Sequence, residues 1–237
     1  FGYAVSLNSN GNIVAISSFR NDVNGINSGH VRVFENISGV WTQIGNDIDG
    51  NFANDFFGLS LNLNADGDIL AIGAGNSSAN GASSGQVTVF KNELGVWTQV
   101  GQSINGEVAQ DRFGREVSLS ADGSILAASS LIHNGRGHVR IFKNEAGFWT
   151  QVGSEIEGEE ISGESGWSVE LSADGNIVAI NTRLNDGNGV DNTGSVRVYE
   201  NINGSWIQIG QDINGELNGD TISSMSLNAD GSIVAFI

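Results

Sequence analysis

Short segments of alternating apolar and polar residues follow one another along the whole chain. Segment 4–8 alternates between the two kinds, and segment 12–16 is almost continuously apolar. Segments 30–34 and 40–44 complete a first group of four. A period of two residues predicts β-strands, and a short unbroken apolar run predicts a strand buried on both faces. No sustained 3.6-residue period appears, so we predict an all-β protein.

The same group of four strands recurs with a regular spacing. Trp-Thr-Gln-Ile/Val-Gly begins at Trp41, Trp97 and Trp149, and a variant begins at Trp206, at separations of 56, 52 and 57 residues. An Asn-Gly or Asp-Gly turn, suited to a tight hairpin, precedes each second strand. These turns span 8–11, 64–67, 120–123, 172–175 and 228–231. The predicted units are approximately 1–56, 57–112, 113–165, 166–220 and a half unit, 221–237.

Repeated four-stranded antiparallel units of this size are typical of β-propeller blades, because each blade hides its apolar faces only against its neighbours. We therefore predict one β-propeller domain over 1–237, with four full repeats and a half repeat. It would be a partial five-bladed ring or an excerpt of a larger ring. A solenoid or stacked β array is the alternative. The half unit lacks its third and fourth strands. Either the fifth blade is partial, or a downstream segment or a partner chain supplies the missing strands. The first residue, Phe1, and the apolar last segment favour an excerpt.

The charge balance limits the classes of partner that the chain can bind. Asp and Glu number 27 against 10 Lys and Arg, for a net charge of −17. Nucleic-acid binding needs basic groups, so we expect no nucleic-acid partner. An anionic membrane surface is disfavoured for the same reason, and no apolar run is long enough to insert into a membrane. The chain has no cysteine, which excludes disulfides and thiolate metal sites.

Phe-Gly pairs stand ahead of the first strand in three units, at Phe1-Gly2, Phe57-Gly58 and Phe113-Gly114. Ser165-Gly166 and Thr221-Ile222 occupy the later positions, and Gly73-Ala74-Gly75 follows a second strand. This pattern resembles the FG-GAP repeat family, which builds integrin α-chain propellers, and repeats of secreted Bacteroidota surface proteins. The resemblance implies a propeller and a secreted, extracellular or cell-surface location.

Calcium-binding members of that family carry a longer run of alternating Asp and Asn. Here the turn has shrunk to pieces such as 64–68, with two carboxylates. Two carboxylates do not supply the six or more oxygens that Ca²⁺ takes. We therefore expect no cofactor and no metal site.

One rim of the predicted ring carries long loops. The links between second and third strands and between units lie there, and we call it the loop rim. The second-to-third links advance 12, 12, 8 and 13 residues. Variable loops on a constant scaffold are how binding faces are made, although drift of unconstrained loops gives the same pattern. The candidate ligand-binding residues on this rim are Arg20, Asp22, Asn24, Asp55, Asp111, Arg112, His133, Arg136, Trp167, Arg183, Asp186 and Asp191.

Two of the sequence features bear on chemistry. Trp167 is the one Trp outside the repeated position, and it is interpreted either as a sugar-stacking residue or as a substituted core aromatic. Glu157, Glu159, Glu160 and Glu164 are interpreted as a solvated acidic run, and no catalytic motif stands out.

We therefore predict a non-catalytic, extracellular adhesion or carbohydrate-binding module. Its partner would be a surface glycan or protein, with self-association or blade completion by another segment. A structural spacer is one alternative. A polysaccharide-active enzyme is another, and it would need a pocket with two convergent carboxylates.

Overall fold

The computed structural model describes residues 1–186 and 191–237, and its regular structure is almost entirely strand. The first sheet, which we call blade 1, contains β1 (Val5–Leu7), β2 (Ile13–Ser18), β3 (His30–Ile37), β4 (Val40–Gln43) and β5 (Ile48–Asp49). Blade 2 contains β6 (Ser60–Leu63), β7 (Ile69–Ala74), β8 (Gln86–Glu93), β9 (Val96–Gln99) and β10 (Ile104–Asn105). Among the described residues, no helix is long and apolar enough to cross a membrane.

The remaining blades repeat this order. Blade 3 contains β11 (Val117–Leu119), β12 (Ile125–Ser130), β13 (His138–Glu145), β14 (Phe148–Gln151) and β15 (Ile156–Glu157), with a short 3₁₀ turn at His133–Gly135. Blade 4 contains β16 (Ser165–Leu171), β17 (Ile177–Thr182), β18 (Ser195–Ile202), β19 (Ser205–Gln208) and β20 (Ile213–Asn214). Blade 5 is the hairpin β21 (Met225–Leu227) and β22 (Val234–Phe236).

Four antiparallel strands in sequence order form each full blade, as predicted. In blade 1 the order is β1-β2-β3-β4, and the two-residue strand β5 pairs with the start of β3 beside β4. The equivalent short strands β10, β15 and β20 pair in the same way with the third strands of their blades. These short fifth strands were not predicted. They extend the outer edge of each blade toward the loop rim.

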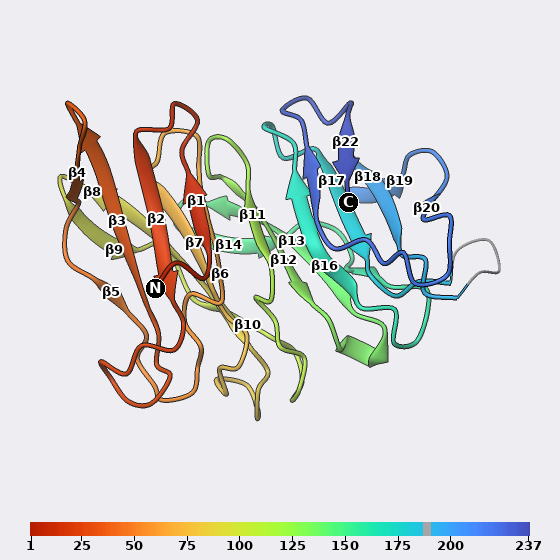
Figure 1. The fold of residues 1–237 in the computed structure, drawn as a ribbon, viewed down its shortest axis with the longest axis horizontal. Coiled ribbons are helices and arrows are strands. Elements are labelled where there is room, and N and C mark those ends of the chain that lie inside the picture. Colours follow the sequence, from red (N-terminus) through yellow and green to blue (C-terminus); the bar gives the residue numbers. More distant parts are fainter. Residues whose placement is uncertain (187–190) are drawn as a thin grey trace.

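The blades follow one another in chain order about a common axis, from red to blue in Figure 1. Their first strands are the innermost, because β1 contacts β6, β6 contacts β11, β11 contacts β16 and β16 contacts β21. The predicted fold, a β-propeller of four full repeats and a half repeat, is confirmed. No strand of the hairpin β21–β22 pairs with blade 1 in the described part of the chain.

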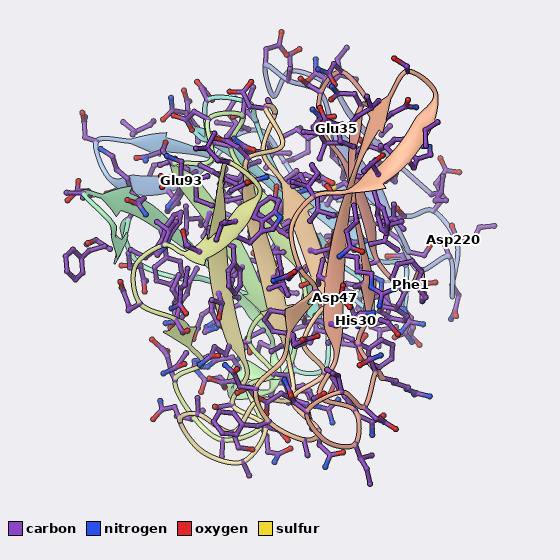
Figure 2. The ribbon with its side chains drawn as sticks, turned by 90° about the vertical axis from the view of Figure 1, so that its left-hand side faces the viewer. Phe1, His30, Glu35, Asp47, Glu93 and Asp220 are labelled. Carbon is purple, nitrogen blue, oxygen red and sulfur yellow. The ribbon has the colours of Figure 1, made fainter. Side chains whose placement is uncertain are left out.

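The repeated tryptophans join neighbouring blades. The indole Nε1 of Trp97 donates to the carbonyl of Ile44 at 3.1 Å, and Trp149 and Trp206 bond the preceding blade in the same manner. Trp149 is 5% exposed, whereas Trp41 in blade 1 is 46% exposed. Trp41 is therefore not a core residue, because no blade precedes blade 1 in the described chain. Figure 2 views this side, where Phe1, His30 and Asp47 lie together.

Main-chain hydrogen bonds also link the hairpin turns of successive blades. The amide of Ser9 donates to the carbonyl of Ala65 at 3.0 Å, and the series continues from Ala65 to Ala121, from Ala121 to Ala173 and from Ala173 to Ala229. The turn glycines permit this close approach. Gly123 has a φ of +70°, and a Cβ there would lie 2.6 Å from the Ile69 side chain of the preceding blade.

Candidate functional site

Tryptophan and arginine side chains meet where the innermost strands of blades 3 and 4 reach the loop rim. Strand β16 starts with a register shift between Ser165 and Ser168, and Trp167 lies within it. The Trp167 indole donates to the carbonyl of Ser223 in the fifth unit at 3.2 Å. The guanidinium carbons of Arg115 and Arg183 lie 4.8 and 4.3 Å from its ring centroid. Cation–π contacts of this kind orient both guanidinium groups.

Each arginine also faces a carboxylate. Arg115 lies 3.8 Å from Glu116, and Arg183 lies 3.5 Å from Glu164. These four side chains are between 23% and 37% exposed, so solvent and small solutes reach them. A guanidinium has five N–H donors, and one ion pair leaves most of them for an anionic ligand. We call Arg115, Glu116, Glu164, Trp167, Glu170 and Arg183 the rim cluster.

Two carboxyl groups of the rim cluster have strongly raised pKa values. The pKa of Glu116 is raised to about 7, chiefly by burial; the charge of Arg115 opposes the change and the charge of Glu170 adds to it. Burial alone raises the pKa of Glu170 to about 7. A third of the Glu116 side chain reaches solvent, so it remains accessible for proton transfer. Carboxyl groups that titrate near neutrality suit general acid–base catalysis, and guanidinium groups suit anion binding.

The sequence had identified only part of this arrangement. Trp167 and Arg183 were candidate ligand residues, and the structure brings them together. With its ring against two guanidinium groups, Trp167 is neither a free sugar platform nor a core residue. Arg115, Glu116 and Glu170 were missed. Glu170 stands where the other innermost strands carry Ser6, Asn62, Ser118 and Ser226, and a comparison of the repeats at this position could have revealed it.

The other candidates are spread along the loop rim. Asp111 and His133 bond each other at 3.0 Å between blades 2 and 3. Arg136 donates to the carbonyl of Glu159. Arg112 is exposed, and its amide donates to Ser83.

Several of the predicted residues hold their own loops together. Asp22 accepts from the amide of Asn27 at 2.7 Å, and Asn24 donates to the carbonyl of Gly50 at 3.0 Å. The Asp186 carboxylate accepts from the amide of Asn192. The remaining three lie apart from them: Arg20 against the ring of Phe19, Asp55 near Ser77, and Asp191 near Gly219. The twelve candidates therefore do not form one surface, and their role in binding remains a prediction.

Comparison with known proteins gives similarity in fold only. No protein-family profile matches the chain, and no curated protein matches it. One similar solved structure, from Bacteroides uniformis ATCC 8492, is described as a "putative 6-phosphogluconolactonase". It aligns with a TM-score of 0.56 and 12% identity over 99% of this chain and 77% of that one. A protein from Bacteroides fragilis NCTC 9343 with the same description aligns with a TM-score of 0.52 and 14% identity, over 98% of this chain and 72% of that one.

These neighbours contradict our prediction of a non-catalytic adhesion or carbohydrate-binding module. Both are described as lactonases, which are enzymes, so the predictions of no enzymatic activity and of an adhesion role were wrong. The error has a physical source. Repeats and an acidic composition constrain the fold and the surface charge, whereas chemistry depends on side chains that only the blade stacking brings together. At 12% and 14% identity the likeness shows the fold, and activity is a proposal.

Proposed function

We propose that the chain is a hydrolase that opens the lactone of an anionic sugar acid at the rim cluster. The observation that carries this proposal is the pair of glutamates with pKa values of about 7 beside two oriented arginines. The descriptions of the two structural neighbours support the same reaction class.

The glutamates supply the proton transfers that lactone opening needs. A deprotonated Glu116 takes a proton from water, and the resulting hydroxide attacks the lactone carbonyl carbon. The bond between that carbon and the ring oxygen breaks, and the ring oxygen receives a proton from the neutral carboxyl of Glu170. Water is consumed and a hydroxy acid is formed. Glu116 is then protonated and Glu170 is ionised, so the pair carries one proton and one negative charge as it did at the start. Transfer of a proton from Glu116 to Glu170 restores the starting state. Carboxyl groups with pKa values near 7 suit both the role of base and the role of acid.

The arginines give the site its preference for an anion. Arg183 is more exposed than Arg115, at 37% against 23%, and we assign it to the phosphate or carboxylate of the substrate. Arg115 is adjacent to Glu116 in the chain, so we assign it to the developing oxyanion. Trp167 touches both guanidinium groups and acts as a positioning residue.

The test is the hydrolysis of 6-phosphogluconolactone and of unphosphorylated gluconolactone, each corrected for its spontaneous rate. We expect the variants E116Q and E170Q to lower kcat at least about 100-fold, the range of general acid–base catalysis. R183M should raise KM for the phosphorylated lactone and leave that for the unphosphorylated one nearly unchanged. E157Q, an exposed glutamate on the same rim, is the matched control. No rate above background with either lactone, or full activity in E116Q and E170Q, would contradict the proposal.

We also propose that the Phe-Gly pairs mark descent from FG-GAP repeats, and that the chain acts outside the cell. Support for descent comes from Phe113, which is fully buried, and Gly114, whose φ of +82° favours glycine. An alignment of close relatives in which Phe-Gly recurs at 57–58 and 113–114 would support descent, and free variation there would oppose it. Fractionation of the source cells tests the location, and recovery in the cytoplasm would contradict it.

A further inference from the structure

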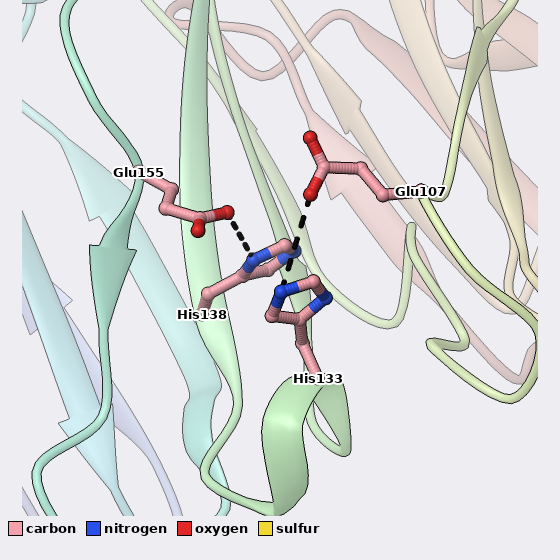
Figure 3. A group of neighbouring side chains, drawn as sticks. All are labelled: Glu107, His133, His138 and Glu155. Atoms are coloured by element: carbon pink, nitrogen blue, oxygen red, sulfur yellow. Dashed lines mark hydrogen bonds and ion pairs between the residues drawn. The ribbon is translucent and has the colours of Figure 1, made fainter.

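A second group of titratable side chains lies at the outer boundary of blades 2 and 3, away from the rim cluster. Glu107 follows β10, His133 is in the 3₁₀ turn, His138 starts β13 and Glu155 precedes β15. Figure 3 shows the two imidazoles and the two carboxylates facing one another. One nitrogen or oxygen from each residue lies within 4.8 Å of those of the other three. We call these four residues the His133 cluster.

The ring of His133 is held in one orientation. Its Nδ1 lies 3.0 Å from Asp111, which is 2% exposed and also accepts from the amides of Glu107 and Val108. The Nε2 of His133 then faces Glu107, 4.0 Å from Oε2. That separation is too long for a hydrogen bond. Two donor atoms on one tetrahedral ion, with bonds of about 2.0–2.2 Å, lie about 3.3–3.6 Å apart, so a shift of about half an ångström would bring this pair to that spacing. A carboxylate on the remote nitrogen of a ligand histidine is the usual second partner in zinc sites.

His138 provides the independent observation that points to a ligand. Its side chain is 0% exposed, and its Nε2 is buried with no hydrogen-bond partner. Its Nδ1 lies 2.7 Å from Glu155, and its ring stacks on His133 with centroids 4.0 Å apart and planes 19° apart. A buried polar atom without a partner is costly, and a metal ion in the cluster would recruit this imidazole.

The charges in the cluster also favour a divalent cation. Glu107, Asp111 and Glu155 contribute −3, and the buried Arg140, 3.4 Å from Glu107, contributes +1. The sum is −2, and one divalent cation would neutralise it. Arg140 contacts Oε1 of Glu107 and leaves Oε2 toward His133.

The next blade boundary provides an internal comparison. There Arg197 lies 3.2 Å from Glu159, which repeats the pair of Arg140 and Glu107. Ser195, however, occupies the position of His138 in the strand register. The Arg–Glu pair is therefore a feature of the repeat, and a histidine at the position of His138 recurs in blade 1 as His30. His133, in contrast, lies in the second-to-third link of blade 3, which is the shortest of the four.

We propose that the His133 cluster binds one divalent transition-metal ion of the zinc type. The ligands are Nε2 of His133, a ring nitrogen of His138 and the carboxylates of Glu107 and Glu155. Two imidazoles and two carboxylates form a donor set that Zn²⁺ accepts in four-coordinate geometry. Asp111 is a positioning residue for His133.

Calorimetric titration of the metal-free chain with ZnCl₂ tests the proposal. We expect one ion per chain, an affinity at least tenfold weaker in H133Q and E155Q, and one 10- to 100-fold weaker in D111N, the usual cost of losing the outer partner. E159Q, the equivalent of Glu107 at the next boundary, and H30Q, the equivalent of His138 in blade 1, should bind as the original chain does. Circular dichroism establishes that each variant is folded.

Cobalt provides a second readout. Co²⁺ bound to the original chain should give the strong visible absorption of a four-coordinate ion, and H133Q should lack it. Absence of saturable Zn²⁺ binding by the folded chain would overturn the proposal. So would unchanged affinity in H133Q and E155Q, or equal loss in E159Q. Since the readout is metal binding, the result is independent of lactone hydrolysis.

Discussion

At the scale of single residues, the two glutamates of the rim cluster couple stability to pH. Their pKa values in the folded chain are about 7, above the ordinary value of 4.5. Below pH 4.5 both carboxyls are neutral in the folded and unfolded states. Between pH 4.5 and 7 the unfolded chain loses these protons first, so the stabilising contribution declines as pH rises. The site therefore retains a proton near neutrality at a cost in stability.

Replacement of both glutamates should remove this decline. The free energy of unfolding of the original chain, minus that of the E116Q/E170Q variant, should fall by about 1–2 kcal/mol per group between pH 5 and pH 8. Solvent access to Glu116 keeps the value below the full linkage. Urea titrations at the two pH values measure it. Comparison with the variant is needed because burial lowers the pKa of His138 to about 3, which makes stability rise with pH over part of the same range. A constant difference would show that the two pKa values are ordinary.

The repeated tryptophans allow a paired test at the same scale. W149F removes the hydrogen bond to Val100 from an indole that is 5% exposed, and we expect a loss of about 2 kcal/mol. W41F alters a side chain that is 46% exposed and should cost less than about 0.5 kcal/mol. Guanidinium unfolding compares them, and equal losses would argue against the stacking of blades described above.

At the scale of elements, the turns between first and second strands tie each blade to the one before it. Both G123A and G95A should lower the free energy of unfolding by about 1 kcal/mol, because alanine is strained at a positive φ. G123A should lower it by at least about 1 kcal/mol more, because the new Cβ would press against Ile69. Gly95 also has a positive φ, +85°, but a Cβ there would meet nothing within 4 Å. The difference in midpoint between the two variants in thermal unfolding isolates the contact between blades. Similar midpoints would mean that Ile69 moves aside freely.

The elements also show what the sequence could and could not predict. The strands of each blade carry the alternation and the Asn-Gly or Asp-Gly turns, so their order and approximate limits were predictable, as for β2 (Ile13–Ser18). The short strands such as β5 (Ile48–Asp49) have two residues and no period to detect. The clusters were less accessible still, because Glu107 and His138 come from different blades and meet only when the blades stack.

At the scale of the whole molecule, the net charge of −17 acts against the compact state through self-repulsion. Added salt screens that repulsion. The free energy of unfolding should rise by about 1 kcal/mol between 20 and 300 mM NaCl at pH 8. Urea titrations in NaCl and in choline chloride separate screening from specific binding of sodium. A fall in stability with salt would indicate that local ion pairs, such as Arg32 with Asp47 at 2.8 Å, outweigh the net charge.

The row of amide-to-carbonyl bonds from Ser9 through Ala65, Ala121 and Ala173 to Ala229 uses no side-chain atom. These main-chain bonds therefore do not depend on which unit comes next in the chain. Unequal crossing-over within such a gene would add or delete a unit and leave this row of main-chain bonds unbroken. The number of units can then vary in evolution. Sequence changes can accumulate in single units, as in blade 3, which has a shortened loop and two neighbouring histidines.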